Sequence, residues 1–290
     1  MGFNVMSYFL VLFAFLLQSP SLDSASPKER QSAVEQMAVL GNRPAIPQLA
    51  AALKKEPKSD VRASIVAALG RIRDPAAGPA LEKTMRDPDQ KVAQEAILAI
   101  GLTAYAPARA VVEQIFRTDP NRTIKSRALE ALSLMHDKAN IPLFESLLLT
   151  DKNDYYRELA AEGLARLQYD AKGWKQVYEQ EKKPNVRNAL AFGLAAAGDL
   201  DYMNDLANGL SGRQAYQVEV YLYELGKYDG KLGELYRYLR SSDPKVRAGI
   251  VRIIGNIGDP NSLDQIRPLR DDSNADVVRE AVTALRKLSR

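Results

Sequence analysis

Apolar residues recur along the chain in blocks of about thirty residues. In the block that begins at Val61, apolar side chains follow at Ile65, Ala68 and Leu69, the spacing of one helix face. A second helical pattern lies within residues 77–85. Each block therefore predicts two helices joined by a short turn.

The blocks share one position, the anchor, which starts each first helix. An earlier block runs from about Pro27 to Pro57, and the later anchors lie 29 to 32 residues apart, at Val61, Val92, Ile124, Tyr156, Val186, Gln217, Val246 and Val278. One helix pair has too little apolar surface to close a core, so successive pairs must stack. The sequence predicts an all-α superhelix over residues 27–290, with about eight helical hairpins plus a terminal helix.

Each block contains residues that are expected to end one helix and begin the next. Gly70, nine residues after its anchor, is expected to end the first helix in the left-handed conformation. Asp74 is then suited to cap the second helix and Pro75 to begin it. Acidic residues next to the anchors are expected to cap the first helices: Asp60, Asp89, Asp119, Asp154, Asp243 and Asp276.

Three segments carry a family resemblance. "DVRASIVAALGRIRDPAAGPAL", "DPKVRAGIVRIIGNIGDPNSL" and "PNVRNALAFGLAAAGDL" resemble HEAT repeats, especially the short bacterial type also found in phycobilisome-lyase-like proteins. The resemblance covers residues 27–290 and implies a right-handed α-α superhelix, an armadillo-like solenoid. It also implies that the Val-Arg helix lines the concave side and that its Arg joins an Asp-Arg ladder between repeats. By position the ladder is matched by Arg62, Arg157, Arg187, Arg247 and Arg279, and broken at Ala93, Lys125 and Val218.

The first 25 residues differ from the repeats. An apolar run from Tyr8 to Leu17 precedes Ser, Pro and Ala residues, and its length fits a signal peptide better than a membrane span. No Lys or Arg precedes the run, and Asp23 disrupts the small-x-small cleavage site near Ala25. A second possible cleavage site lies at Ser19-Pro20-Ser21. Cleavage would place the protein in the periplasm or outside the cell. An uncleaved segment would anchor it to the inner membrane, as its only membrane contact.

Composition excludes several kinds of site. Without Cys there is neither a disulfide nor a thiolate metal site, and the single His136 excludes a two-His metal site. His136 is interpreted as a helix C-terminal cap or a surface residue rather than a general base. The sequence has no phosphate-binding GxxxxGK[ST], HExxH, Gly-x-Ser-x-Gly or GxGxxG motif, so we expect no metal and no cofactor.

The charge balance is mild. Lys and Arg number 40 against 36 Asp and Glu, and the basic residues are interleaved with acids along nearly every segment. A surface that binds phosphates would cluster its basic side chains on one face. Nucleic acid is therefore disfavoured as a partner.

Candidate partner contacts follow from the helix geometry. If the anchors face the core, positions two and six after each anchor point toward the concave surface. The residues predicted there to contact a partner are Glu130, Glu158, Glu162, Phe192, Glu219, Tyr223 and Arg252. The three middle glutamates can be a patch that attracts a basic partner, an acid-base pair or a solvated ridge.

Aromatic residues are unevenly distributed. Eleven of the 13 Tyr lie between Tyr155 and Tyr238, together with the only Trp, Trp174. They either form an interface, where Tyr and Trp are favoured, or fill repeats whose helices pack less tightly.

The combined pattern predicts a non-enzymatic, exported protein–protein interaction scaffold that binds a protein or peptide on the concave face of the solenoid. A bilin-lyase-like protein and a nucleic-acid-binding HEAT-like protein are the alternatives that the resemblance leaves open. The iron-dependent hydroxylases built on such repeats need several His-Glu pairs, which one His cannot supply.

Overall fold

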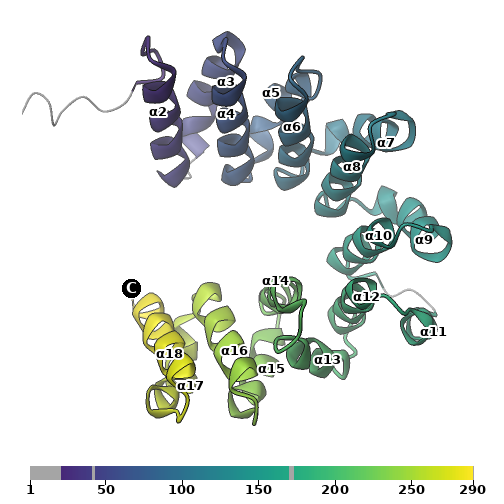
Figure 1. Cartoon of the computed structure of the whole chain (residues 1–290), viewed down its shortest axis with the longest axis vertical. Helices are drawn as coiled ribbons and strands as arrows, with labels where there is room; N and C mark the ends of the chain where they lie inside the picture. The colour runs from purple at the N-terminus through teal and green to yellow at the C-terminus, as the bar shows by residue number, and fades with distance from the viewer. Residues whose placement is uncertain (1–20, 41–42, 170–172, 290) are drawn as a thin grey trace, which may run out of the picture. The chain divides into compact units, whose positions relative to one another are not determined.

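A computed structural model describes residues 21–40, 43–169 and 173–289 of the chain (Figure 1). Within these ranges every regular element is helical and no strand is present. Of the predicted signal peptide, residues 1–25, the first 20 residues lie outside the described part of the chain. The chain divides into two compact units at Asp137/Lys138, and each unit is described by itself.

The first unit contains two rows of helices. The even-numbered helices pack side by side in chain order, and each odd-numbered helix packs against the even-numbered helix that follows it. Short 3-10 turns lead into the odd-numbered helices. The helices are α2 (Pro27–Leu40), α3 (Ile46–Lys55), α4 (Ser59–Ile72), α5 (Gly78–Thr84), α6 (Gln90–Leu102), α7 (Arg109–Thr118) and α8 (Arg122–Leu134).

The second unit repeats this arrangement, and α9, α11 and α13 lie outside the bend formed by α10, α12 and α14 (Figure 1). Its helices are α9 (Ile141–Thr150), α10 (Asp154–Arg166), α11 (Trp174–Gln180), α12 (Pro184–Ala196), α13 (Tyr202–Gly209), α14 (Ala215–Leu225), α15 (Lys231–Leu235), α16 (Pro244–Ile257), α17 (Leu263–Ile266) and α18 (Ala275–Leu288). The seventeen described helices, seven in the first unit and ten in the second, confirm the predicted all-α solenoid.

The predicted apolar positions form the core. In α4, Val61, Ile65, Ala68 and Leu69 are all buried, and the equivalent residues of α16 are buried as well. Complete burial of a Val, Ile or Leu side chain contributes about 1.5–3 kcal/mol, and this contribution recurs with each stacked helix. Each unit is therefore held together by contacts between neighbouring helices.

The caps agree with the prediction only in part. Asp89 and Asp243 are N-caps whose carboxylates accept backbone amides of α6 and α16, and Asp74 caps the turn that begins at Pro75. Asp119 lies two residues before the actual cap of α8, Asn121. The other three acids lie inside the first turns of their helices, where their negative charge interacts favourably with the positive end of the helix dipole: Asp60, Asp154 and Asp276.

The prediction that Gly70 ends its helix is wrong. The helix α4 continues to Ile72, and Arg73 takes the left-handed conformation with φ 54°. A Cβ atom at Gly70 would lie 3.0 Å from the Cβ of Ala99 on α6. The small residue at this position therefore lets adjacent helices approach closely.

In most repeats the residue with the left-handed conformation lies three positions after the one that corresponds to Gly70. Its positions include Arg73, Ala104, His136, Gln168, Gly198 and Gly258. Four of these six are not glycine, so packing of the two helices, rather than local preference, imposes the turn. The exposed His136 occupies one of these turns directly after α8, as the sequence interpretation expected.

None of the described helices is both long enough and apolar enough to span a lipid bilayer.

Candidate protein-binding surface

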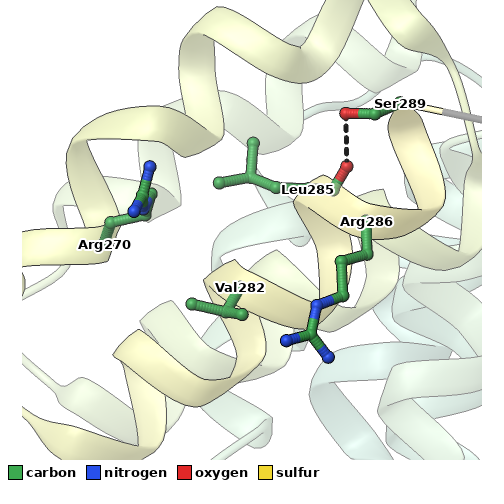
Figure 2. Close-up of a pocket in the computed structure, with 5 residues that line it drawn as sticks. All are labelled: Arg270, Val282, Leu285, Arg286 and Ser289. Carbon is green, nitrogen blue, oxygen red and sulfur yellow. Dashed lines mark hydrogen bonds between the residues drawn. The ribbon is translucent and has the colours of Figure 1, made fainter.

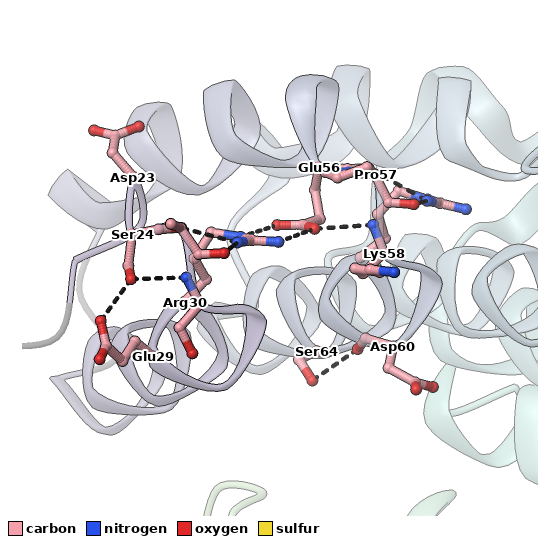
Figure 3. A network of polar contacts seen from close by, with 12 residues as sticks. Asp23, Ser24, Glu29, Arg30, Glu56, Pro57, Lys58, Asp60 and Ser64 are labelled. Atoms are coloured by element: carbon pink, nitrogen blue, oxygen red, sulfur yellow. Dashed lines mark hydrogen bonds and ion pairs between the residues drawn. The ribbon is translucent and has the colours of Figure 1, made fainter.

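Arginines one position after the anchor join the loops of successive hairpins. Arg62 donates from Nε and Nη2 to the two carboxylate oxygens of Asp87, both at 2.8 Å, and from Nη1 to the carbonyl of Pro57 at 3.0 Å. One side chain thus links the loop before α4 to the loop before α6. Equivalent rungs are Arg30–Glu56 (Figure 3), Arg157–Glu181 and Arg247–Asp272.

This ladder corrects the predicted one. Arg30 was not predicted as a member, and two predicted members have other partners. Arg187 stacks on the ring of Tyr178 at 4.1 Å and donates to the Tyr178 carbonyl, whereas Arg279 pairs with Asp276 in its own helix. The ladder carboxylates lie two residues before the N-cap positions, so they were not among the acids that the sequence singled out.

Acid should weaken the ladder. Hydrogen bonds from the facing arginines hold the pKa of Glu56, of Asp87 and of Asp272 below the ordinary values, against the effect of burial. Because the folded pKa is the lower one, this stabilisation is complete above the unfolded pKa of about 4 and is lost as pH falls through the folded pKa.

We expect Asp87→Asn to lower the stability of the first unit by about 1–3 kcal/mol at pH 7 and by progressively less below about pH 4. Urea unfolding followed by far-UV circular dichroism over a pH series measures this difference. The control is Asp60→Asn, which changes an exposed acid in the first turn of α4. A difference between wild type and Asp87→Asn that stays constant down to pH 2 would contradict the assignment.

A buried polar network joins α10, α12 and α14. Arg166 on α10, with only 6% of its side chain exposed, donates to Glu162 at 3.0 Å and through two nitrogens to Glu224 on α14, each at 3.0 Å. The hydroxyl of Tyr221 donates to Glu162 at 2.6 Å. These contacts join α10 to α14 across the intervening α12.

Glu158 extends the network. Its carboxylate accepts from Asn185 on α12 at 2.7 Å and from Gln217 on α14 at 2.6 Å. Burial raises the pKa of Glu158, and the Glu162 carboxylate raises it further, against the hydrogen bond from Asn185. Gln217 also donates to the Tyr221 hydroxyl at 2.9 Å, which explains why a polar residue replaces an apolar anchor there.

The network changes the interpretation of three predicted contacts. The carboxylate oxygens of Glu158 and Glu162 already accept hydrogen bonds within the unit, so a partner would have to replace these contacts. The prediction that Phe192 contacts a partner is wrong, since its side chain is fully buried and stacked on Tyr221 with 4.8 Å between ring centroids. Tyr221 thus belongs to the core, whereas other tyrosines of the 155–238 segment are exposed.

Glu130, on α8 of the first unit, is half-buried and pairs with Arg127 at 2.8 Å. Its predicted contact with a partner stays a prediction.

An open groove lies between α14 and α16. Tyr216, Val220 and Tyr223 line one side at the i, i+4, i+7 spacing of a helix face, and Ile253 and Asn256 of α16 complete it. The cavity measures about 420 Å³, and Tyr216 is 83% exposed. Exposed aromatic side chains of this size are typical of protein interfaces.

Charged groups surround the groove. Arg252 donates from Nε and Nη2 to Glu219 at 2.8 and 3.0 Å, and from Nη1 to Glu280 on α18 at 3.2 Å. The ammonium of Lys227 lies 4.1 Å from the ring centroid of Tyr223, and Lys287 donates to Asn256 at 2.6 Å.

The groove contains part of the predicted site. Glu219 and Tyr223 line it, and Arg252 lies beside it through its ion pair with Glu219. Counting from the anchor missed Val220, Ile253 and Asn256, and Tyr216 was singled out only as one of the eleven clustered tyrosines. The signal was available, because Tyr216, Val220 and Tyr223 form a helical stripe that is offset from the positions counted from the anchor.

A second hollow, of about 470 Å³, lies at α18 and is lined by Arg270, Val282, Leu285, Arg286 and Ser289 (Figure 2). None of the residues that line this hollow is aromatic, whereas Tyr216 and Tyr223 line the α14/α16 groove. We take the α14/α16 groove as the candidate binding surface.

The described residues contain no group of three or more His, Cys, Asp or Glu side chains that could hold a metal ion.

Comparison with known proteins identifies the repeat. The family model for HEAT repeats matches residues 16–90, 79–165 and 224–289. No curated protein matches the chain in sequence.

Several solved structures are similar over most of their length. Human deoxyhypusine hydroxylase in complex with glycerol is 17% identical, with 98% of each chain covered and a TM-score of 0.38. YibA of Escherichia coli is 20% identical, with 100% of this chain and 99% of that chain covered and a TM-score of 0.43. The complex of CpcE and CpcF of phycocyanin lyase from Nostoc sp. PCC7120 is 17% identical, with 92% and 91% covered and a TM-score of 0.40.

Proposed function

The chain belongs to the HEAT-repeat family, and we propose that it is a non-enzymatic interaction scaffold that binds a protein or peptide in the groove between α14 and α16. The observation that carries the proposal is Tyr216, a large aromatic side chain that stands 83% exposed at a groove lined by Val220 and Tyr223. Tyr supplies a large contact area with few rotatable bonds and a polar tip, which makes it a frequent source of binding energy.

The polar network of α10, α12 and α14 supports this location. On α10 and α12 the polar side chains are engaged with each other and with α14, so a partner would have to break hydrogen bonds to use them. In the groove, by contrast, a partner's side chain only displaces solvent from an existing cavity. The alternatives of a bilin-lyase-like and a nucleic-acid-binding protein have no comparable site residue in their favour.

The double substitution Tyr216→Ala/Tyr223→Ala should reduce binding of the native partner at least tenfold, because Tyr is enriched among the few interface residues whose truncation costs about 2 kcal/mol or more. Quantitative affinity purification from the native cell, with partners identified from the wild-type sample, measures the effect. The control is Leu149→Ala on α9, which removes a side chain that is 66% exposed and outside the groove. Equal recovery by all three proteins would contradict the assignment of the groove.

Export is also part of the proposal, on the strength of the apolar run from Tyr8 to Leu17. The carbonyls of Ser24 and Ala25 accept hydrogen bonds from Arg30 at 2.8 and 3.2 Å, and the Ser24 hydroxyl donates to Glu29 (Figure 3). Cleavage after Ala25 would remove these acceptors from the first rung of the ladder, whereas cleavage near Ser19–Ser21 would keep them.

We therefore expect N-terminal sequencing of the protein from fractionated native cells to find a mature chain that begins between Pro20 and Leu22. A chain that begins at Ser26 would contradict this expectation. Recovery of a chain that begins at Met1 in the membrane fraction would instead support the uncleaved anchor.

A further inference from the structure

We propose that the groove accepts a segment that carries a bulky apolar side chain next to a carboxylate, with the carboxylate at the C-terminal ends of α14 and α16. This inference rests on the proposed function and names the chemistry of the partner. It differs from the basic partner that was one of the three interpretations left open for the middle glutamates.

The difference follows from which charges are already paired. Glu158 and Glu162, two of the three middle glutamates, accept hydrogen bonds in the buried network, and Glu219 and Glu280 pair with Arg252. Around the groove, Glu219 and Glu280 share the guanidinium of Arg252, so these three groups leave one negative charge, against the two positive charges of Lys227 and Lys287. A basic partner would have to compete with Arg252.

Two ammonium groups beside the groove lack such a partner. None of the carboxylates in the described part of the chain forms an ion pair with Lys227 or Lys287. Each lysine is instead held by an uncharged group that lines the groove. Lys227 lies over the ring of Tyr223, and Lys287 donates to the side-chain oxygen of Asn256.

Both lysines lie at the same end of the groove. Tyr223 and Asn256 are within the last turns of α14 and α16, which end at Leu225 and Ile257. Tyr216 lies in the first turn of α14, at the opposite end. The groove thus has an aromatic end and a cationic end, with Val220 and Ile253 between them.

This polarity specifies the ligand. A cavity of about 420 Å³ is in the size range of small-ligand sites and holds one large side chain. An aromatic or large aliphatic residue between Tyr216 and Tyr223 would bury apolar area and contact both rings. A carboxylate a few ångströms further on would meet Lys227 and Lys287 in a charge-assisted hydrogen bond.

The competing account is that the two lysines only complement the negative ends of the helix dipoles. Such interactions contribute about 0.3–1 kcal/mol to stability at exposed sites and have no bearing on ligand choice. The two accounts differ in what Lys227→Gln/Lys287→Gln changes: ligand affinity in one, thermal stability alone in the other.

The test is selection of short random peptides with free C-termini against the full chain, followed by fluorescence anisotropy with the most enriched synthetic peptide. We expect enrichment of a large apolar residue near Asp, Glu or the C-terminal carboxylate. Affinity should fall about tenfold in Lys227→Gln/Lys287→Gln and stay within about twofold in the control Lys182→Gln/Lys245→Gln, which removes the same charge from exposed positions.

Peptide variants identify the source of the carboxylate. Amidation of the C-terminus or replacement of the acidic residue by its amide should weaken binding to the wild type about tenfold and have little further effect in Lys227→Gln/Lys287→Gln, since the two changes remove the same contact. Whichever peptide change has this effect shows whether a terminal or a side-chain carboxylate is bound.

Other outcomes separate the inference from the proposed function. Peptides that lose affinity in Tyr216→Ala/Tyr223→Ala but not in Lys227→Gln/Lys287→Gln, or that are enriched in Lys and Arg, would overturn the inference and leave the groove intact. Enriched peptides that bind Tyr216→Ala/Tyr223→Ala as tightly as the wild type would refute the groove itself, and so would a selection without enrichment.

Discussion

Replacement of Arg166 by Met should lower the stability of the second unit by about 3–5 kcal/mol, because it leaves two carboxylates without their cation in a largely buried place. Glu162 and Glu224 both depend on this guanidinium, which is only 6% exposed. Trp174, the only Trp, is buried in the same unit, so its fluorescence during urea unfolding reports the effect.

The matched control removes the charges together. In Arg166→Met/Glu162→Gln/Glu224→Gln no buried charge is left unpaired, and we expect most of the lost stability to return, since whole buried ion pairs are often replaceable without loss. A single variant as stable as the wild type would show that the network has little energetic role. A triple variant less stable than the single one would show that the hydrogen bonds to Glu162 outweigh the charge balance.

Gly101→Ala should destabilise the first unit by about 1–3 kcal/mol or more through overpacking. A Cβ atom at Gly101 would lie 2.5 Å from the Cα and 2.6 Å from the carbonyl oxygen of Ala131 on α8. Backbone atoms cannot rotate away, so α6 and α8 would have to move apart. The urea midpoint of unfolding followed by far-UV circular dichroism should fall, while the midpoint followed by Trp174 fluorescence, which reports on the second unit, stays unchanged.

Three residues further on, Ala104→Gly is the opposite test. Ala104 has φ 49°, a conformation that costs a residue with a Cβ atom about 1–2 kcal/mol and glycine almost nothing. We therefore expect Ala104→Gly to stabilise the first unit. If Gly101→Ala were neutral and Ala104→Gly destabilising, the glycine of the repeat would be a turn residue after all.

The comparison of these two positions shows what periodicity predicts and what it leaves open. The spacing of anchors such as Val61 and Val92 predicts paired helices because burial of one face follows from helical geometry. The same pattern cannot distinguish a glycine needed for close approach from one needed for a left-handed turn, since both suit glycine at the end of an apolar stretch. That choice depends on the neighbouring helix, here on Ala99 and Ala131.

The candidate site shows a similar division. Counting positions from the anchor found Glu219 and Tyr223, which line the groove, because α14 presents the expected face there. The same counting failed for Phe192, which the bend of α10, α12 and α14 buries against Tyr221. Arg166 and Glu224 are 58 residues apart in the sequence, so no local pattern could indicate that they meet.

In most solenoids each repeat is coupled only to its nearest neighbours, so the repeats can unfold one at a time. The bridge from Arg166 to Glu224 adds a coupling between second neighbours, because α12 cannot detach without α10 or α14 also losing its place. The three helices α10, α12 and α14 are therefore expected to unfold cooperatively, in a single step, when the second unit is stretched by force or partly unfolded. The helices α16 and α18 can still unfold one at a time.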